Sequence, residues 1–132
     1  MTLRVYYEDT DAGGIVYHSN YLNFCERARS EYFFQAGESP VLEGGEFVVV
    51  SLEAKFKASA RLGDLLDVKT QVLSLKSSSL ILHQSVRKDN VILFDMQIKL
   101  AYVKEGKVGR MRSETKDYIQ KLFRQHVLKF EE

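Results

Sequence analysis

The apolar residues of this chain recur with two different periods, 3.6 residues in some segments and two residues in others. Between Tyr21 and Phe34 they follow the helical period, which predicts an amphipathic helix of about four turns. Ser19 or Asn20 is suited to cap the start of this helix, and Gly37 is suited to end it through a left-handed turn. The chain therefore offers one long helix early in its sequence.

The segments with a period of two predict strands that have one apolar and one polar face. We expect one short strand before the helix and four strands after it, at about residues 3–8, 47–57, 66–72, 80–86 and 91–103. In the segment 47–57 the even positions from Val48 to Phe56 are apolar, which predicts one buried face. Asp89 and Asn90 fit a two-residue hairpin turn. The segment 91–103 is the longest, so we expect it at the centre of the sheet.

The expected order is one strand, one long helix, four strands in a meander and a short C-terminal helix from about Ser113. Short connections would make the last four strands antiparallel neighbours, and the apolar face of their sheet needs a helix laid across it. The helix that starts near Asn20 is the available one. The sequence thus predicts a single α+β domain over residues 1–132, with an antiparallel five-stranded sheet wrapped around one long helix, which is the hotdog fold.

Composition and charge exclude several classes of protein. With 45% apolar and 28% charged residues, the chain has the composition of one compact globular domain. The formal charge of +1 hides an uneven distribution, because residues 1–54 carry −6 and residues 55–132 carry +7. This division disfavours a uniformly basic nucleic-acid-binding protein, so we expect no nucleic-acid partner.

Targeting signals and cysteine chemistry are also informative. No segment approaches the roughly 18 consecutive apolar residues that span a bilayer, and acids stand near the N-terminus where a signal peptide has its apolar core. We therefore expect a cytoplasmic protein that does not span a membrane. The single cysteine, Cys25, lies on the apolar side of the expected helix, which disfavours a nucleophilic role.

The densest group of reactive side chains lies in the segment YYEDTDAGGIVYHSNY, from Tyr6 to Tyr21. Gly13 and Gly14 permit a backbone bend and a close approach to a ligand. The residues after them open the expected helix, where backbone N–H groups lack intrahelical acceptors and can stabilise an oxyanion on a carbonyl. A carboxylate held opposite could attack that carbonyl or activate a water.

A rival interpretation starts from Asp9 and Asp11. On a strand, this D-x-D pair would point both carboxylates to one face and could bind Mg²⁺ for phosphoryl chemistry. The sequence contains no phosphate-binding loop of the GxxxxGK[ST] type and no further acidic cluster at a later strand end. We therefore expect neither a metal site nor another cofactor.

The pattern D-T-D-x-x-G-x-V-Y-H-x-N-Y-L, with the ERARSE helix after it, resembles the hotdog acyl-CoA thioesterases of the 4-hydroxybenzoyl-CoA thioesterase family. The closest resemblance is to the Tol-Pal-associated acyl-CoA thioesterase branch. It continues through residues 54–66 and covers nearly the whole chain. The resemblance implies hydrolysis of acyl-CoA thioesters without a cofactor.

The resemblance also implies roles for single residues. Asp11 matches the catalytic carboxylate, which acts as a nucleophile or as a general base on water. His18 matches the helix-start residue whose backbone N–H polarises the thioester carbonyl, and in this branch its side chain is also implicated. Tyr7 matches a further position of the branch, with an aromatic filling the sheet core as the alternative. The expected substrate contacts around them are Gly14, Val16 and Tyr17.

A CoA thioester also requires cations at some distance from the carboxylate, because CoA carries phosphates on a long arm. Arg110 and Arg112 resemble the paired arginines that hold the nucleotide phosphates in the family, and Lys76 matches part of its basic loop. Arg61 is a looser candidate. A solvated surface charge is the alternative for each of these residues.

The family resemblance implies assembly as well. Hotdog thioesterases pair protomers edge to edge, so that their strands form one sheet and each site uses residues from both chains, and dimers often form tetramers. We expect a homo-oligomer that acts on acyl-CoA, with acyl carrier protein as a further carrier and membrane-lipid metabolism as the setting. The alternative is a non-catalytic acyl-CoA or acyl carrier protein binding module in phospholipid metabolism. A hotdog dehydratase is disfavoured because its His-containing loop is not evident before the long helix.

Overall fold

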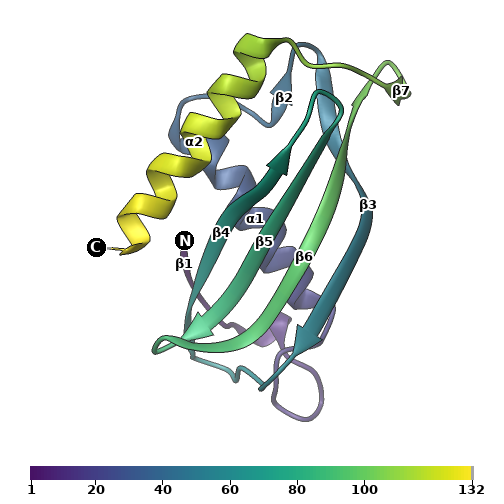
Figure 1. The fold of residues 1–132 in the computed structure, drawn as a ribbon. Coiled ribbons are helices and arrows are strands. Elements are labelled where there is room, and N and C mark those ends of the chain that lie inside the picture. The colour runs from purple at the N-terminus through teal and green to yellow at the C-terminus, as the bar shows by residue number, and fades with distance from the viewer. Residues whose placement is uncertain (132) are drawn as a thin grey trace.

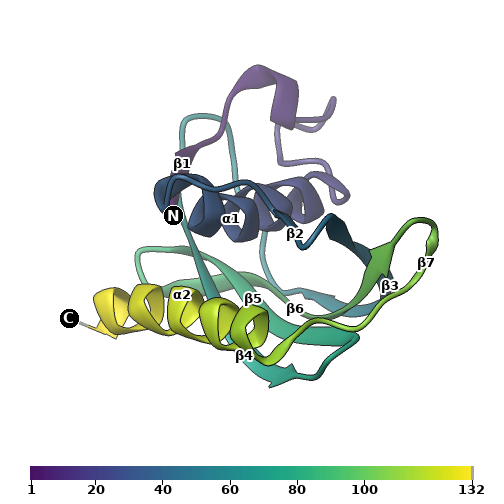
Figure 2. The ribbon, with the colours of Figure 1, turned by 90° about the horizontal axis from the view of Figure 1, so that it is seen from above.

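A twisted antiparallel sheet curls around one long helix in the computed structural model, which describes residues 1–131, with side chains as far as Arg124 (Figure 1). The long helix is α1 (Asn20–Gln35), and a second helix, α2 (Ser113–Glu131), packs along β4 and against the end of α1 (Figure 2). A short 3-10 helix, η1, covers Tyr7–Asp9. The strands are β1 (Thr2–Arg4), β2 (Val41–Leu42), β3 (Gly45–Phe56), β4 (Leu65–Leu75), β5 (Ser79–Lys88), β6 (Val91–Lys104) and β7 (Lys107–Val108).

The sheet has the order β1-β4-β5-β6-β3-β2, with β7 paired to the end of β6. Each of the five expected strands has a counterpart, and the longest, β6, lies inside the sheet between β5 and β3 as expected. The first, expected over residues 3–8, is wrong in its second half, because β1 ends at Arg4 and residues 7–9 form η1. The two-residue strands β2 and β7 were not predicted, so the sheet has seven strands rather than five. The α+β architecture with a sheet wrapped around α1 is confirmed.

The expected four-strand meander is wrong at its first connection. β4, β5 and β6 do form a meander, but β3 pairs along its length with β6 and not with β4. The connection of residues 57–64 therefore carries the chain from one side of the meander to the other. Consecutive strands are neighbours in most sheets but not in all, and this connection is long enough to cross.

A bulge in β3 changes which side chains face α1. The register passes from Val49 opposite Leu100 to Ser51 opposite Lys99, so Val50 is the extra residue. Val49 and, beyond the bulge, Leu52 share the face that carries α1. A one-residue shift moves every following side chain to the other face. The prediction that the even positions from Val48 onward share one buried face is therefore wrong for Val48 and Val50. Leu52 and Phe56 do share a face, but both are exposed rather than buried.

Helix α1 packs on β4 and β5 through the apolar side predicted from the sequence. Its buried residues include Tyr21, Phe24, Cys25, Ala28 and Tyr32. Gly37 ends the helix with a φ of 79°, and the Gly37 N–H donates to the carbonyl of Phe34 at 3.0 Å, as expected for a left-handed turn. Ser19 is the N-cap residue, although its side chain makes no capping hydrogen bond.

A buried glutamine fixes α1 on the sheet. Gln84 of β5 is fully buried, and its Nε2 donates to the Cys25 carbonyl and to Thr70 Oγ1, both at 2.9 Å. Its Oε1 accepts a hydrogen bond from Arg29 Nη1 at 3.3 Å. A satisfied buried polar network specifies one arrangement of the elements it joins. The middle of α1 is thereby held in one place above the sheet.

Candidate active site

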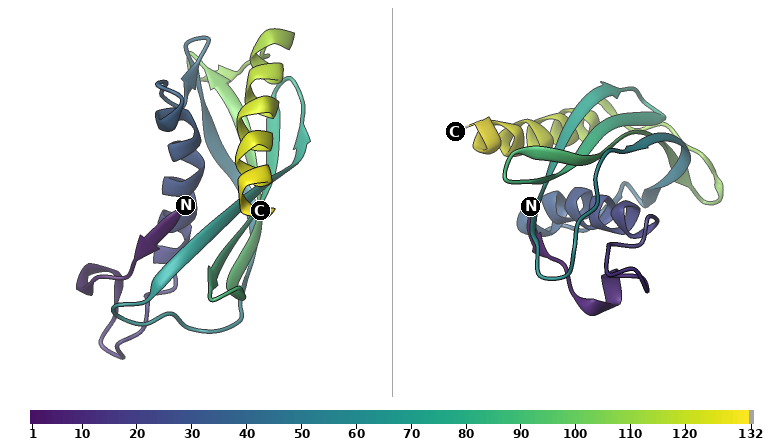
Figure 3. Two further views of the ribbon diagram at one scale, coloured as in Figure 1. Left: turned by 90° about the vertical axis from the view of Figure 1, so that its left-hand side faces the viewer. Right: turned by 90° about the horizontal axis from the view of Figure 1, so that it is seen from below.

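The candidate site lies in the loop of residues 10–18, which leads into α1 at the end of the sheet where β3 ends and β4 begins (Figures 1 and 3). The connection 57–64 supports this loop. The Val16 N–H donates to the Ala60 carbonyl at 2.9 Å, and Ile15 forms an isolated bridge with Arg61. The Ala60 N–H in turn donates to the Tyr21 hydroxyl at 2.9 Å. The crossing connection thus positions the loop through these hydrogen bonds.

The Asp11 carboxylate is held by a tight turn. Its Oδ1 accepts the Gly13 N–H at 2.8 Å, and the Gly14 N–H donates to the Asp11 carbonyl at 3.0 Å. Gly14 has a φ of 78°, a conformation that favours glycine. A Cβ at Gly13 would lie 3.2 Å from Asp11 Oδ1, so a side chain there would crowd the carboxylate. The two glycines therefore orient Asp11, which is exposed to solvent.

The backbone at His18 offers a hydrogen-bond donor. Among the described residues, nothing accepts a hydrogen bond from the His18 N–H. The imidazole lies against Tyr17, with 4.4 Å between ring centroids, and 6.2 Å from the ring of Phe56. A free N–H at a helix start is suited to bind an oxyanion.

A pocket of about 310 Å³ joins these groups. It is lined by Asp11, Ile15, Val16, His18, Tyr21, Phe56, Lys57, Ala58 and Ser59. Three of the predicted residues, Asp11, Val16 and His18, thus meet at one pocket. Gly14 shapes the turn next to it, and Tyr17 packs on the His18 ring. Arg61 contacts the loop through its backbone bridge with Ile15.

Lys57 is a lining residue that the sequence did not single out. Its Nζ lies 3.2 Å from Asp95 Oδ2 on β6, so its charge is paired. The only sequence signal for it was its place at the end of the segment 47–57, where a lysine on the polar face of a strand is common.

Tyr7 does not lie in this pocket. The residue belongs to η1, and its side chain is 80% exposed. The alternative that Tyr7 fills the sheet core is therefore wrong. The catalytic role of Tyr7 stays a prediction, because within a single chain Tyr7 does not line the pocket that holds Asp11.

Asp9 has a structural role that separates it from Asp11. The carboxylate is buried, its Oδ2 accepts the Tyr6 N–H at 2.9 Å, and its Oδ1 accepts Asn20 Nδ2 at 2.6 Å. Asp9 thereby ties η1 to the first residue of α1. The two aspartates lie in different environments, and residues 1–124 contain no group of three or more His, Cys, Asp or Glu side chains placed to hold a metal ion. The geometry does not fit the D-x-D magnesium hypothesis.

The predicted phosphate-binding cations gather at the opposite end of the sheet. Lys76 lies in the turn between β4 and β5, and the Met111 N–H donates to the Ser77 carbonyl at 2.7 Å, which brings Arg110 and Arg112 beside that turn. β4 runs from the Asp11 end to this end, a span of about 30 Å at the usual rise of a strand. A single chain therefore does not bring these cations to Asp11.

One of these cations is already engaged. The Glu43 carboxylate accepts hydrogen bonds from the Arg112 N–H at 2.9 Å, from Arg112 Nε at 3.2 Å and from the Thr115 hydroxyl. The Thr115 hydroxyl and the Arg112 N–H lower the pKa of Glu43. Glu43 thus caps the start of α2 and neutralises Arg112, a pairing that no local sequence pattern indicated.

Cys25 is excluded as a nucleophile by its surroundings. Its side chain is fully buried on the sheet-facing side of α1, as expected. Burial raises the pKa of the thiol to about 12, so the reactive thiolate is scarce at neutral pH.

An antiparallel sheet curled around a helix, with a carboxylate and a free helix-start N–H at one pocket, defines a hotdog-fold protein equipped to act on a carbonyl. The family described as "Thioesterase superfamily" matches residues 13–93, and the chain belongs to this family. It is a thioester hydrolase, which confirms the class indicated by the sequence resemblance.

Individual relatives agree with this assignment. The chain is 41% identical over 128 residues to the acyl-CoA thioesterase YbgC of Helicobacter pylori (strain ATCC 700392 / 26695), covering 95% of this chain and 96% of that protein. It is 26% identical over 132 residues to the 4-hydroxybenzoyl-CoA thioesterase of Pseudomonas sp. (strain CBS-3), covering 91% and 94% of the two chains. The solved structure of a probable thioesterase from Bartonella henselae superposes with a TM-score of 0.79 at 32% identity, covering 85% of this chain and 97% of that one.

No helix in the described part of the chain is long and apolar enough to cross a membrane.

Proposed function

We propose that this protein hydrolyses acyl-CoA to a free carboxylic acid and CoA at the pocket that holds Asp11 and His18. The observation that carries the proposal is that two residues line the same pocket: Asp11, whose carboxylate is exposed and oriented, and His18, which stands just before the N-cap of α1 and whose N–H has no acceptor among the described residues. The similarity to proteins named acyl-CoA thioesterases supports the choice of CoA thioesters as the substrate class.

In the proposed reaction the thioester carbonyl oxygen accepts a hydrogen bond from the His18 N–H, which stabilises the charge that develops on it. Asp11 then acts in one of two ways. As a nucleophile it forms a mixed anhydride with the acyl group and expels the CoA thiolate, and water hydrolyses the anhydride. As a general base it takes a proton from a water that attacks the carbonyl directly. Both routes consume one water and release one acid and one thiol.

The side chains of His18 and Tyr7 have secondary parts in the proposal. The exposed imidazole of His18, beside Tyr17, orients the attacking water or protonates the departing thiolate. The exposed Tyr7 acts from η1, which precedes the loop of residues 10–18, on substrate or on a second copy of the chain.

Oligomerisation through β3 would complete the site. Within the described sheet, β2 pairs only with Gly45 and Glu46, so the edge of β3 from Phe47 to Phe56 is unpaired. Antiparallel pairing of this edge with the same edge of a second copy reverses the ends of the second sheet. It thereby carries the second copy's phosphate-binding candidates, Lys76, Arg110 and Arg112, toward Asp11.

The cellular setting follows from the branch resemblance. We propose a cytoplasmic enzyme of membrane-lipid metabolism, active on acyl groups carried by CoA and by acyl carrier protein, and assembled as a tetramer of two hotdog dimers. The unpaired edge of β3 supports the dimer contact within that assembly.

The test of the catalytic proposal is Asp11→Asn, with thiol release measured from aromatic, short-chain and long-chain acyl-CoAs. The amide is neither a nucleophile nor a base, so we expect turnover to fall by at least about a thousandfold with fold and CoA affinity retained. Glu8→Gln is the matched control, because Glu8 is an exposed acid in the neighbouring η1. Wild-type turnover in Asp11→Asn would remove the proposal. Thermal stabilisation of the wild-type protein by acyl-CoAs without any thiol release would favour the binding-module alternative.

His18→Ala separates the two proposed parts of His18, because alanine keeps the backbone N–H. If only the N–H acts, kcat and its pH profile change little. If the imidazole handles a proton, kcat falls by about 10² and the pH profile changes shape. An unchanged pH profile would eliminate the side-chain role.

A further inference from the structure

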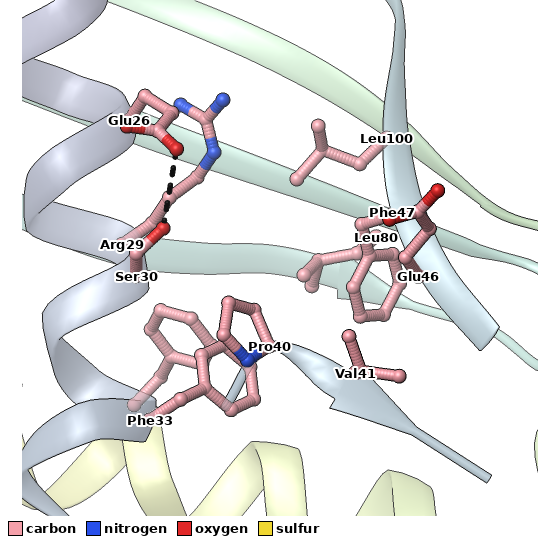
Figure 4. Close-up of a pocket in the computed structure, with 11 residues that line it drawn as sticks. Glu26, Arg29, Ser30, Phe33, Pro40, Val41, Glu46, Phe47, Leu80 and Leu100 are labelled. Atoms are coloured by element: carbon pink, nitrogen blue, oxygen red, sulfur yellow. Dashed lines mark hydrogen bonds between the residues drawn. The ribbon is translucent and has the colours of Figure 1, made fainter. Parts of the chain in front are cut away.

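Two polar contacts on α1 differ in what they hold in place. In the middle of the helix, Glu26 accepts a hydrogen bond from the Ser30 hydroxyl at 3.5 Å, beside a pocket of about 220 Å³ (Figure 4). Both partners belong to α1, so this contact orients nothing outside the helix. At the start of the helix, Asn20 Nδ2 donates to Asp9 Oδ1 at 2.6 Å and joins α1 to η1. This second contact lies two residues from His18, whose N–H is the proposed oxyanion donor.

The direction of the His18 N–H depends on the Tyr17 carbonyl. These two groups belong to one planar peptide unit, in which they point in opposite directions. The Tyr17 carbonyl accepts the Asn20 N–H at 2.8 Å. A contact that fixes Asn20 therefore also fixes this carbonyl. Because the peptide unit is rigid, the same contact fixes the direction in which the His18 N–H points.

Asp9 holds both ends of the turn that contains His18. Its backbone carbonyl accepts the Tyr17 N–H at 2.9 Å, and its Oδ1 accepts the side chain of Asn20. Its Oδ2 accepts the Tyr6 N–H at 2.9 Å, which anchors the carboxylate itself. We call these three hydrogen bonds the Asp9 clamp. One residue of η1 thus holds the turn from Tyr17 to Asn20 at its two ends.

Burial makes the Asp9 clamp hard to replace with water. Asp9 is 4% exposed, whereas Asp11 and His18 are exposed to solvent. Hydrogen bonds to an ionised group are stronger than bonds between neutral groups, and a buried group that loses its partner has little water to replace it. The loop therefore combines exposed groups that can meet a substrate with a buried group that holds them.

We propose that Asp9 is a positioning residue for hydrolysis, which aims the His18 N–H at the thioester carbonyl through the Asp9 clamp. The inference rests on the proposed function and adds to it a residue that does not touch the substrate. An oxyanion donor is most effective when it is oriented before the reaction, because no rearrangement is then needed as charge develops. Loss of the clamp therefore lowers kcat and leaves KM nearly unchanged.

Asp9→Asn tests the clamp. The new amide has one acceptor oxygen for two donors, so it loses either the Asn20 contact or the Tyr6 contact. We expect kcat for acyl-CoA hydrolysis to fall by about 30-fold or more, because a small misplacement of reacting groups is costly. We expect KM to change by less than about threefold, because the lost interaction belongs to the transition state. Wild-type kcat in this variant would overturn the inference.

Exchanging the two side chains tests whether the hydrogen bond itself matters. In the double variant Asp9→Asn/Asn20→Asp, the amide at position 9 donates to the carboxylate at position 20, and its oxygen still accepts the Tyr6 N–H. The net charge is also unchanged. We expect the double variant to recover at least about half of the wild-type kcat, since the two sites are coupled. Equal losses in the single and double variants, in folded protein, would overturn the inference.

Asn20→Ala is a milder variant that keeps the test valid if Asp9→Asn does not fold. It deletes the same side-chain contact from the α1 side and leaves the bond between Asp9 and Tyr6 in place. Alanine also favours the helix that starts at this position. We expect kcat to fall about tenfold with KM nearly unchanged. An unchanged kcat would contradict the proposed role of Asp9.

Two controls separate positioning from a general loss of stability. Glu8→Gln removes the neighbouring acid of η1, which is exposed, and leaves kcat unchanged. Ile119→Ala opens a cavity in the buried cluster that holds α2. This second control lowers the melting temperature, but kcat measured on folded protein stays at the wild-type value. A loss of kcat in Ile119→Ala as large as that in Asp9→Asn would assign the effect of Asp9 to stability alone.

Amide hydrogen exchange, followed by NMR, tests the clamp without relying on hydrolysis. We expect the Tyr17 and Asn20 N–H groups to exchange at least about tenfold faster in Asp9→Asn than in the wild-type protein, and to regain protection in the double variant. Unchanged exchange would refute the Asp9 clamp and leave the hydrolysis proposal intact. Absence of thiol release from the wild-type protein would instead refute the hydrolysis proposal, and with it the catalytic purpose of the clamp.

Discussion

β3 and β5 are two long strands of one sheet, yet the apolar side chains on their common face meet different surroundings. On β5, Leu82 and Val86 are fully buried beneath α1. On β3, Leu52 is 41% exposed and Phe56 is 54% exposed. The reason is the position of α1, which packs on β4 and β5 and leaves much of β3 uncovered, although Phe56 still meets the ring of Tyr21 (Figures 2 and 3).

The difference shows that an alternating strand pattern predicts a face that must be covered by apolar groups. The pattern does not show whether that cover comes from the same chain or from another molecule. For β5 the cover is the chain's own helix. For β3 the apolar surface continues to an unpaired strand edge, and contiguous exposed apolar surface of this kind marks a site of association. In the proposed dimer, the bare strand is therefore the part of the fold whose stability depends on a second molecule.

The largest expected contrast is in folding stability. Leu82→Ala creates a cavity under α1 and should lower the free energy of unfolding by about 2–5 kcal/mol. Leu52→Ala removes a half-exposed side chain and should cost about 1 kcal/mol or less when unfolding is measured on dilute, monomeric protein. Urea unfolding of both variants measures the two changes in the free energy of unfolding. Equal losses of stability would show that β3 is covered within the single chain.

The next contrast concerns association. Val49→Lys places a charge on the bare face of β3 and should weaken the dimer about thirtyfold or more, the effect of a central interface residue. Val48→Lys places the same charge on the opposite face of the same strand and serves as the control. Sedimentation equilibrium gives both dissociation constants. Similar values for the two variants would argue against an interface over this face.

Thiol reactivity offers a third contrast between the covered and the bare region. Cys25 lies on the buried face of α1 with its pKa raised to about 12, so its labelling at pH 8 should be at least about a hundredfold slower than that of an ordinary thiol. Leu52→Cys in a Cys25→Ala background should label rapidly in the dilute monomer. Rapid labelling of Cys25 in the wild-type protein would mean that α1 does not shield β5.

The smallest expected effect is at the hairpin that precedes β3. The pKa of Glu43 is lowered in the folded chain, so its contribution to stability is present above the unfolded pKa near 4.5 and is lost as pH falls through the folded value. Glu43→Gln should therefore lower the melting temperature slightly at pH 7 and have a smaller effect near pH 3. Glu105→Gln, in the exposed hairpin between β6 and β7, is the control. A loss that is the same at both pH values would assign the role of Glu43 to packing rather than charge.

Features set by neighbouring residues were predictable from the sequence. The helical period and Gly37 define α1, and Asp89 with Asn90 forms the expected tight turn, with φ values of 51° and 67°. Within the site, Asp11 and His18 were indicated by their motif, and the fold brings both to one pocket.

Features that depend on distant contacts were not predictable. Residues 47–50 are all apolar, so nothing in their pattern reveals that Val50 is a bulge or that the following side chains change faces. The engagement of Arg112 by Glu43 joins segments 69 residues apart. The separation of the phosphate-binding candidates from Asp11 likewise follows from the three-dimensional arrangement of the strands, which no single segment encodes.

The crossing connection of residues 57–64 has a consequence for how this scaffold can change. It links β3 to β4 and also carries the loop of Asp11 through the contacts of Val16 with Ala60 and of Ile15 with Arg61. An insertion within it would misplace the reactive groups while leaving every strand pairing possible. The hairpin at Glu105 and Gly106, remote from that loop, is the position where added sequence should be tolerated. Insertions should therefore be tolerated at the end of the sheet that carries the β6–β7 hairpin and poorly tolerated at the end that carries the loop of Asp11.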